Sequence, residues 1–415
     1  MQTKTFTVLI ALGVLLALVI STAVPRVNAA ELKVGPSAQY HTISEAVKAA
    51  NTGDTVFVAP GTYVEDVMVD KPLRVVATNS SAAATIVKAT APNKDVFTLS
   101  GSDITIQGFT ITGGNYGVTF AKASNCVLTR CVVKDNTYGV YLAGATSNLI
   151  SNNNLNNNGF GMYLDGSSGN KLVNNSARYE RGGGGKASLS DGIYMHSSNA
   201  NNVTRCDLSN NNNFGASLYD SRNNAFSYNT LSANTQFGVR LRDGSDYNRF
   251  VHNTFRANAE NGVLIGNSTG NAFYFNDFLE EKSHFYSQEN NNINSTRKVD
   301  YTYSGSQFNG FVGNYYSDYV GTDADGNGIG DSSFSRDKFP LVKPMENYRE
   351  GWPTPTPIPS VASAKTASIA ENVTNDTQND QRAAALPGFE WISTLFGLLV
   401  AALIFAVLQR AKALR

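Results

Sequence analysis

The stretch Gly139-Val140-Tyr141-Leu142 decides the fold, because its pattern of glycine, apolar, variable and apolar residue returns along the chain. The pattern stands at residues 117–120, 139–142, 161–164, 192–195, 215–218, 238–241 and 262–265, at spacings of 22, 22, 31, 23, 23 and 24 residues. A repeat of this size, built on short apolar triplets, is typical of a solenoid in which each unit adds one coil.

Asparagines recur at matched offsets within these units: Asn148 and Asn153, Asn170 and Asn175, Asn224 and Asn229, Asn248 and Asn253, Asn271 and Asn276. Asparagine tolerates left-handed backbone and bonds to its neighbours, so we expect these residues at corners, stacked into ladders between coils. Short β-rich segments joined by Asn and Gly corners favour a β-helix over helical or leucine-rich repeats. The sequence therefore predicts an all-β fold, a right-handed, single-stranded parallel β-helix.

A different pattern precedes the repeats. Residues Thr42 to Ala50 have apolar side chains at helical spacing, and Gly53 to Tyr63 then begin the strands. We expect a short amphipathic helix that caps the open edge of the first coil, since an exposed edge invites aggregation.

The two ends of the chain have another character again. Lys4, the apolar residues 6–24 and the small residues 29–30 follow the order of a secretory signal, which we expect to be removed; a retained anchor is the alternative. The far end has a Pro/Thr/Ser-rich stalk, then Pro387-Gly388-Phe389, an apolar segment and basic residues, which together predict a C-terminal transmembrane helix with its end in the cytoplasm.

These features predict six segments. They are a signal peptide (1–30), a cap with the first coils (31–100), β-helix repeats (101–312), a C-terminal coil with an Asp-rich loop (313–350), a stalk (351–386) and a membrane anchor (387–415). The protein is thus expected to be exported and held at the outer face of the cell membrane.

Charge and cysteine content exclude other classes. The 33 basic and 33 acidic residues cancel and no basic block stands out in the middle of the chain, so nucleic acid is not an expected partner. Cys126, Cys131 and Cys206 are too few to frame a disulfide-rich module, and we expect them to be buried thiols.

The end of the repeat region carries a more specific signal. Gly313-Asn-Tyr-Tyr-Ser-Asp-Tyr319, Asp323-Ala-Asp-Gly-Asn-Gly-Ile-Gly-Asp331 and Phe339-Pro-Leu341 resemble the NosD-type and CASH-type (carbohydrate-binding and sugar-hydrolase) proteins of the pectate-lyase-like β-helix superfamily. Residues 387–415 resemble the PGF-type sorting signal of archaeal surface proteins, which implies that the helix is either retained or replaced by a lipid. The resemblance implies contact with carbohydrate or, through the NosD label, a role related to copper.

Strand alternation predicts which side chains face outward. The residue two after each glycine forms one row, and the residue four after it forms a second row beside the first. The two rows bring together the candidate ligand-binding residues Tyr141, Tyr163, Asp165, Tyr194, His196, Tyr219, Arg240 and Arg242. Aromatic rings beside charged and hydrogen-bonding groups suit a shallow glycan groove, although stacked tyrosines also stabilise neighbouring strands without a ligand.

Several functions remain open at this stage. The preferred hypothesis is a cell-surface protein that binds polysaccharide or glycoprotein glycans. The alternatives are a polysaccharide lyase or glycoside hydrolase, an envelope scaffold or adhesin, and a NosD-like copper-related accessory. For an enzyme, Asp220 and Asp243 at equivalent corners are a candidate carboxylate pair and Arg240 or Arg242 a candidate base, but no catalytic residue is assigned.

Calcium is the cofactor that the sequence favours. Asp323, Asp325, Asn327 and Asp331 match the first part of an oxygen-ligand loop, while Phe334 stands where a bidentate glutamate would close it, so other ligands, with Asp318 and Asp337 as candidates, would complete the shell. Copper is not expected, because none of the histidines His41, His196, His252 and His284 pairs with Cys or Met in a motif. Sequons at Asn79, Asn174, Asn202, Asn267, Asn294, Asn372 and Asn375 are compatible with N-glycosylation.

Overall fold

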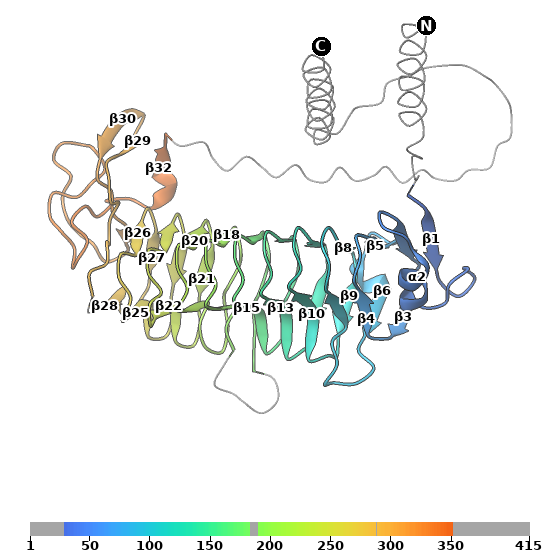
Figure 1. Cartoon of the computed structure of the whole chain (residues 1–415). Helices are drawn as coiled ribbons and strands as arrows, with labels where there is room; N and C mark the ends of the chain where they lie inside the picture. The colour runs from blue at the N-terminus through green and yellow to red at the C-terminus, as the bar shows by residue number, and fades with distance from the viewer. Residues whose placement is uncertain (1–28, 183–189, 288, 352–415) are drawn as a thin grey trace, which may run out of the picture. The chain divides into compact units, whose positions relative to one another are not determined.

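The structure is a computed structural model that describes residues 29–182, 190–287 and 289–351. Within this part the chain is a parallel β-solenoid whose coils follow one another along a common axis from the N-terminal to the C-terminal side (Figure 1). The predicted all-β parallel β-helix is confirmed.

Two long parallel sheets form most of the solenoid. The eleven-stranded sheet has, in spatial order, β1 (Glu31–Val34), β2 (Thr55–Val58), β5 (Arg74–Ala77), β8 (Thr105–Gln107), β11 (Val127–Thr129), β14 (Leu149–Ser151), β16 (Lys171–Val173), β18 (Asn202–Thr204), β20 (Ala225–Ser227), β23 (Arg249–Val251) and β26 (Ala272–Tyr274). The ten-stranded sheet has β4 (Val67–Val69), β7 (Phe97–Leu99), β10 (Tyr116–Ala121), β13 (Tyr138–Ala143), β15 (Phe160–Asp165), β17 (Ile193–His196), β19 (Ala216–Tyr219), β22 (Phe237–Arg242), β25 (Asn261–Gly266) and β28 (Phe285–Ser287).

The third side of the coils is built from two shorter parallel sheets. One has β3 (Gly61–Val64), β6 (Thr85–Lys88), β9 (Thr110–Thr112) and β12 (Val132–Lys134), and the other has β21 (Thr230–Ser232), β24 (Thr254–Arg256), β27 (Asp277–Leu279) and β31 (Tyr315–Tyr316). Isolated bridges at Asn154, Ser176 and Asp207 connect the two sheets across the middle coils.

The core is a set of columns in which like residues stack on like. Leu128 lies opposite Ile150, and further along the same column Phe226, Phe250 and Phe273 follow one another in register. Ring centroids of Phe250 and Phe273 are 4.6 Å apart and nearly parallel. Each such aromatic contact is worth about 0.5–1.5 kcal/mol beyond the area it buries, so the columns hold successive coils in register.

A short helix caps the N-terminal end, as the sequence predicted. Helix α2 (Ile43–Ala49) buries Ile43, Ala46 and Val47 and packs against β1, β2 and β4. The Thr42 side chain accepts a hydrogen bond from the Glu45 N–H and the Glu45 carboxylate accepts one from the Thr42 N–H, which is a complete capping box.

The predicted asparagine ladders are present and are more extensive than expected. Three columns of buried side chains each accept a hydrogen bond from the backbone N–H of the residue one coil before. Their members are Cys126, Asn148, Asn170, Asn201, Asn224, Asn248, Asn271 and Asn291; Cys131, Asn153, Asn175, Cys206, Asn229, Asn253, Asn276, Asn314 and Asp337; and Asn136, Asn158, Glu180, Asn211, Asn234, Asn258 and Glu281. A serine column, Ser167, Ser198, Ser221, Ser245 and Ser268, forms a fourth.

One expectation about these ladders was wrong. The ladder asparagines do not adopt left-handed backbone; the residue before most of them does, as at Asn152 (φ 58°), Tyr228 (φ 57°) and Phe275 (φ 52°). The ladder side chain must point inward to bond the next coil, so the sharp bend falls on its neighbour. Even bulky residues accept this conformation there, because the ladder bonds offset its cost of about 1–2 kcal/mol.

The glycines of the repeat are required by close backbone approach. A methyl group on Gly139 would lie 2.6 Å from the carbonyl oxygen of Gly161, and one on Gly161 would lie 2.6 Å from that of Gly192. The same contact measures 2.6 or 2.7 Å at Gly117, Gly192, Gly215 and Gly238. These glycines form a column in which the coils touch through backbone alone.

The C-terminal end departs from the parallel pattern. Strands β29 (Val299–Tyr303), β30 (Ser306–Gly310) and β32 (Tyr348–Glu350) form an antiparallel sheet, which packs beside β26 through Phe275, Tyr301 and Tyr348 (Figure 1). The predicted repeat segment 101–312 therefore includes a hairpin that is not a coil.

Other predicted segments lie outside the described residues: the signal peptide, nearly all of the stalk and the C-terminal apolar segment. Within the described ranges no helix is both long and apolar enough to cross a bilayer.

Candidate functional site

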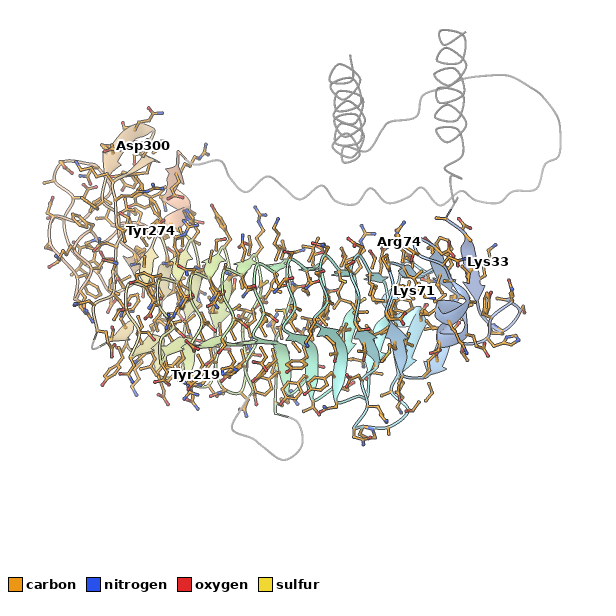
Figure 2. All side chains as sticks on the ribbon, viewed as in Figure 1. Lys33, Lys71, Arg74, Tyr219, Tyr274 and Asp300 are labelled. Carbon is orange, nitrogen blue, oxygen red and sulfur yellow. The ribbon has the colours of Figure 1, made fainter. Side chains whose placement is uncertain are left out.

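The two predicted outward rows are neighbours on the ten-stranded sheet. Strand register places Thr119, Tyr141, Tyr163, Tyr194, Ser217, Arg240 and Leu264 opposite one another in succession, and does the same for Ala121, Ala143, Asp165, His196, Tyr219, Arg242 and Gly266. All eight candidate ligand-binding residues thus share one face. Figure 2 shows Tyr219 on this side of the solenoid, away from Arg74 and Tyr274 of the eleven-stranded sheet.

Tyrosines in contact with one another form the N-terminal half of this face. The rings of Tyr163 and Tyr194 stack with centroids 4.9 Å apart, and Tyr141 lies 5.4 Å from Tyr163 at a 58° tilt. Burial raises the pKa of the Tyr141 phenol to about 12, with Asp165 adding to the effect, so the hydroxyl stays protonated. The rings remain half-exposed, although each is partly covered by contact with its neighbouring ring.

Sequence reasoning missed a third row of this face. The residue before each repeat glycine is aromatic in five coils: Tyr116, Tyr138, Phe160, Phe214 and Phe237. Tyr116 stacks on Tyr138 and on Tyr141, with centroids 4.9 and 4.6 Å apart. The signal was the recurrent aromatic-glycine pair, which widens the predicted line of tyrosines into a patch.

A polar group lies beside the tyrosines. Asp165 and His196 are on adjacent coils, with Asp165 Oδ1 2.8 Å from His196 Nδ1, and the Tyr141 hydroxyl donates to Asp165 Oδ2 at 3.3 Å. The His196 ring in turn lies 5.3 Å from the Tyr219 ring. Because both side chains are about 40% exposed (39% for His196, 41% for Asp165), this group is available to a ligand.

Two arginines occupy the next coils. The Arg240 guanidinium lies over the Phe214 ring, 4.0 Å from its centroid, and its Nε donates to the Ser217 hydroxyl at 3.2 Å. The Arg242 guanidinium lies 4.7 Å from the centroid of the Tyr219 ring. Each cation is therefore held on an aromatic surface, which fixes its position.

A buried carboxyl lies in the same region. Asp191 stands in the aromatic row between Phe160 and Phe214 and is fully buried; its Oδ1 accepts from the Asn213 amide at 2.7 Å, while its Oδ2 has no partner among the residues that the structure describes. Burial raises its pKa to about 7, although Arg240 acts in the opposite direction. No signal in the repeat pattern pointed to this residue.

The outward positions are less uniform than alternation implied. Thr119 and Ser217 face outward but are buried, because Thr119 donates to Asp95 and the Arg240 side chain covers Ser217. The corner residues Asp220 and Asp243 have left-handed backbone and lie 3.6 Å from Arg222 and 3.8 Å from Arg242. These ion pairs suit a structural role at the corners.

The Asp-rich loop uses its carboxylates internally. Asp323 accepts from the backbone N–H groups of Asn327 and Gly328, Asp325 accepts from Asn327, and Asp331 accepts from the N–H of Ala324. In the described ranges no group of three or more His, Cys, Asp or Glu side chains converges as a metal shell. Calcium binding by Asp323, Asp325, Asn327 and Asp331 stays a prediction.

The two residues expected to complete that shell lie elsewhere. Asp337 is fully buried, where its Oδ2 accepts from the Asn314 N–H and the Tyr316 hydroxyl. Asp318 lies 2.9 Å from His284 Nε2. Both carboxyls already have partners of their own, so completion of the loop's shell by either one stays a prediction.

Three of the histidines lie beside carboxylates, and all three cysteines are buried. His196, His252 and His284 each lie beside a carboxylate, Asp165, Glu350 and Asp318 respectively. The three cysteines are buried and unbonded, as predicted, and burial raises the pKa of the Cys131 thiol to about 11. The thiols occupy ladder positions where other coils have asparagine.

Comparison with known families matches the solenoid itself. Residues 95–188, 116–278 and 186–316 fit the family described as "Right handed beta helix region". Together these matches extend over residues 95–316, which is more than half of the chain.

Individual proteins show more distant similarity. A cell surface glycoprotein from Methanothermus fervidus is 30% identical over 111 residues, which are 26% of this chain and 18% of that protein. An alginate lyase from Paenibacillus sp. str. FPU-7 superposes with TM-score 0.45 at 16% identity, over 60% of this chain and 94% of the lyase. The pectate lyase Pel9A gives TM-score 0.42 at 15% identity, over 64% and 79% of the two chains. The chain thus spans less than a fifth of the length of the glycoprotein that it matches.

Proposed function

Because this chain belongs to the right-handed β-helix family, we propose that it binds polysaccharide or glycoprotein glycans through the outer face of its ten-stranded sheet. The observation that carries the proposal is the patch of aromatic rings continuous with exposed polar groups, from Tyr116 through Tyr163 to His196. Sugars offer apolar CH surfaces and hydroxyls together, and such a mixed surface contacts both.

We place this activity outside the cell, at the outer face of the membrane. Support comes from the secretory-type N-terminus, the stalk and the apolar C-terminal segment of the sequence, and from the local similarity to an archaeal cell surface glycoprotein. We also propose that residues 313–341 are a NosD/CASH-type ending and that residues 387–415 are a PGF-type surface anchor.

The row geometry suits an elongated ligand. Successive coils repeat at about 4.8 Å, so neighbouring side chains of a row present contacts at a regular spacing along the solenoid axis. A polymer that crosses several strands can engage one side chain in each coil. No deep cavity is needed for such binding.

The test is binding of the purified full chain to a panel of neutral and acidic polysaccharides, measured by affinity electrophoresis with reducing-end assays for turnover. Tyr163→Ala should weaken binding about fivefold, as expected for a lost aromatic contact of about 1 kcal/mol. Tyr247→Ala is the matched control, since Tyr247 is 63% exposed and lies outside the three rows.

The outcomes separate the alternatives. Released products would favour a lyase or hydrolase. Equal binding by Tyr163→Ala and the wild type would show that the glycan does not bind at the proposed face. A panel without any binder would favour an envelope scaffold. Thermal melts with calcium and with chelator would show whether the loop at Asp323 binds calcium, because a bound ion should raise the melting temperature.

A further inference from the structure

The C-terminal half of the proposed binding face has a chemistry of its own. In the first outward row the tyrosines end at Tyr194, and two coils further on the same face carries Arg240 and Arg242, with Tyr219 beside them in the second row. At about 4.8 Å per coil, Arg240 lies roughly 10 Å along the axis from Tyr194. A ligand long enough to contact Tyr163 and Tyr194 therefore reaches these arginines.

Both arginines are held on aromatic rings, and of the two only Arg242 has a salt bridge within the described residues, to Asp243. Arg240 is fixed by the Phe214 ring and by one bond from Nε to Ser217, which leaves its two terminal nitrogens without a protein acceptor in the described residues. Arg242 lies over Tyr219, and its contact with Asp243 is a long one, 3.8 Å from Nε. Holding a cation in place before binding removes part of the ordering cost of a complex.

Among the neighbouring carboxylates, Asp243 is the one in an ion pair with these arginines, through its long contact with Arg242. Asp191 forms no ion pair with Arg240, and burial raises its pKa to about 7, so near neutral pH it holds a proton for part of the time. Asp165 is engaged by His196 and Tyr141, and Asp220 by Arg222 and Ser197. The charge of Arg240 is therefore not balanced by an ion pair within the described residues, and that of Arg242 is balanced only by the long contact with Asp243.

We propose that Arg240 and Arg242 form an anion subsite, which binds a carboxylate or sulfate substituent of the glycan whose uncharged part contacts Tyr163 and Tyr194. Planar guanidinium groups bind such oxyanions through paired hydrogen bonds. This inference rests on the proposed glycan binding and adds a substrate class, acidic glycans, and a direction in which they lie along the solenoid.

The test compares three polymers on the full chain: polygalacturonate for carboxylate, dextran sulfate for sulfate, and dextran as the neutral reference. Arg240→Gln and Arg242→Gln should each weaken binding of at least one anionic polymer about tenfold and leave dextran binding unchanged. Arg240→Lys keeps the charge but loses the planar fork, and should give an intermediate loss. The carboxylate and sulfate arms identify which anion is preferred.

Arg256→Gln is the control, because Arg256 is exposed on β24, in another sheet, and its loss changes the net charge equally. Circular dichroism melts of each variant separate lost binding from lost folding. If both Gln variants bind the anionic polymers as tightly as Arg256→Gln does, the anion subsite is wrong. In that case Tyr163→Ala tests the proposed function separately. Weakened binding by this variant would support glycan binding at the face without an anion subsite, and unchanged binding would contradict both proposals.

Discussion

At the scale of single residues, the ladders explain how polar side chains can fill the inside of a corner. A ladder asparagine accepts from one backbone N–H, and most also donate to a backbone carbonyl, as Asn211 does with Glu180 N and Ala177 O. Leaving such buried groups unbonded would cost about 1–3 kcal/mol each. Glu180, Glu281 and Asp337 stand in ladder positions but have no amide to donate.

The carboxyl of Glu281 gives a pH prediction. Burial raises its pKa to about 7, against the opposing hydrogen bonds from Asn258, whereas an unfolded chain releases this proton near pH 4.3. The stability supplied by the protonated form is complete below about pH 4 and is lost as the pH rises through 7. Glu281→Gln should therefore shrink the difference in unfolding free energy between pH 5 and pH 8, by up to about 3 kcal/mol.

Urea unfolding at the two pH values measures this difference. The exposed neighbour Glu260→Gln serves as the control and should behave as the wild type. A Glu281→Gln variant with an unchanged pH dependence would show that the ladder carboxyl is ionised in the folded protein.

Residue-level prediction from sequence succeeded for the ladder members and failed for their backbone. The matched spacing of Asn148 and Asn170 was visible in the sequence, and it reported a real contact. The left-handed residues were invisible, because Asn152, Tyr228 and Phe275 have nothing in common except their place before a ladder residue.

At the scale of elements, alternation within each strand was enough to assign the outward rows. Apolar first and third residues, such as Val140 and Leu142, are fully buried, and the residue between them faces out. The aromatic row before the glycines was missed because prediction began at the glycine. The antiparallel sheet β29–β30–β32 was missed because it lies outside the repeat, where the period gives no information.

The capping helix gives the prediction at this scale. Thr42→Ala removes the side-chain acceptor for the Glu45 N–H and should lower the free energy of unfolding by about 1 kcal/mol. Thermal or urea denaturation measures the loss. Thr52→Ala, an exposed threonine just after the helix, should change stability by less than half as much. Equal losses would mean that the cap does not limit the stability of the first coil.

At the scale of the whole molecule, the solenoid is a sum of similar coils that touch their neighbours. Each coil pairs with the one before and the one after, so stability is approximately a sum of coil and interface terms. The two ends are closed differently, by α2 at the first coil and by the antiparallel sheet near the last.

This additivity predicts that one complete coil can be removed. Deleting residues 139–160 joins Tyr138 to Gly161 and lets β10 pair with β15 in the register that β13 now uses. The shortened chain should keep its β-type circular dichroism and a cooperative transition at a somewhat lower temperature, and should bind glycan more weakly because Tyr141 is lost. Deleting only residues 139–149 breaks the register and should abolish that transition; a folded half-coil deletion would contradict the additive picture.

The glycine column makes the distance between coils independent of the side chains on the face. Since strand pairing sets the pitch at about 4.8 Å, and Gly139, Gly161 and Gly192 let the backbone of the next coil approach closely, we expect the pitch to stay constant when an outward residue is exchanged. The solenoid is therefore a scaffold of constant spacing, on which a single substitution at any coil changes one ligand contact. The outward residues of the other coils keep their positions.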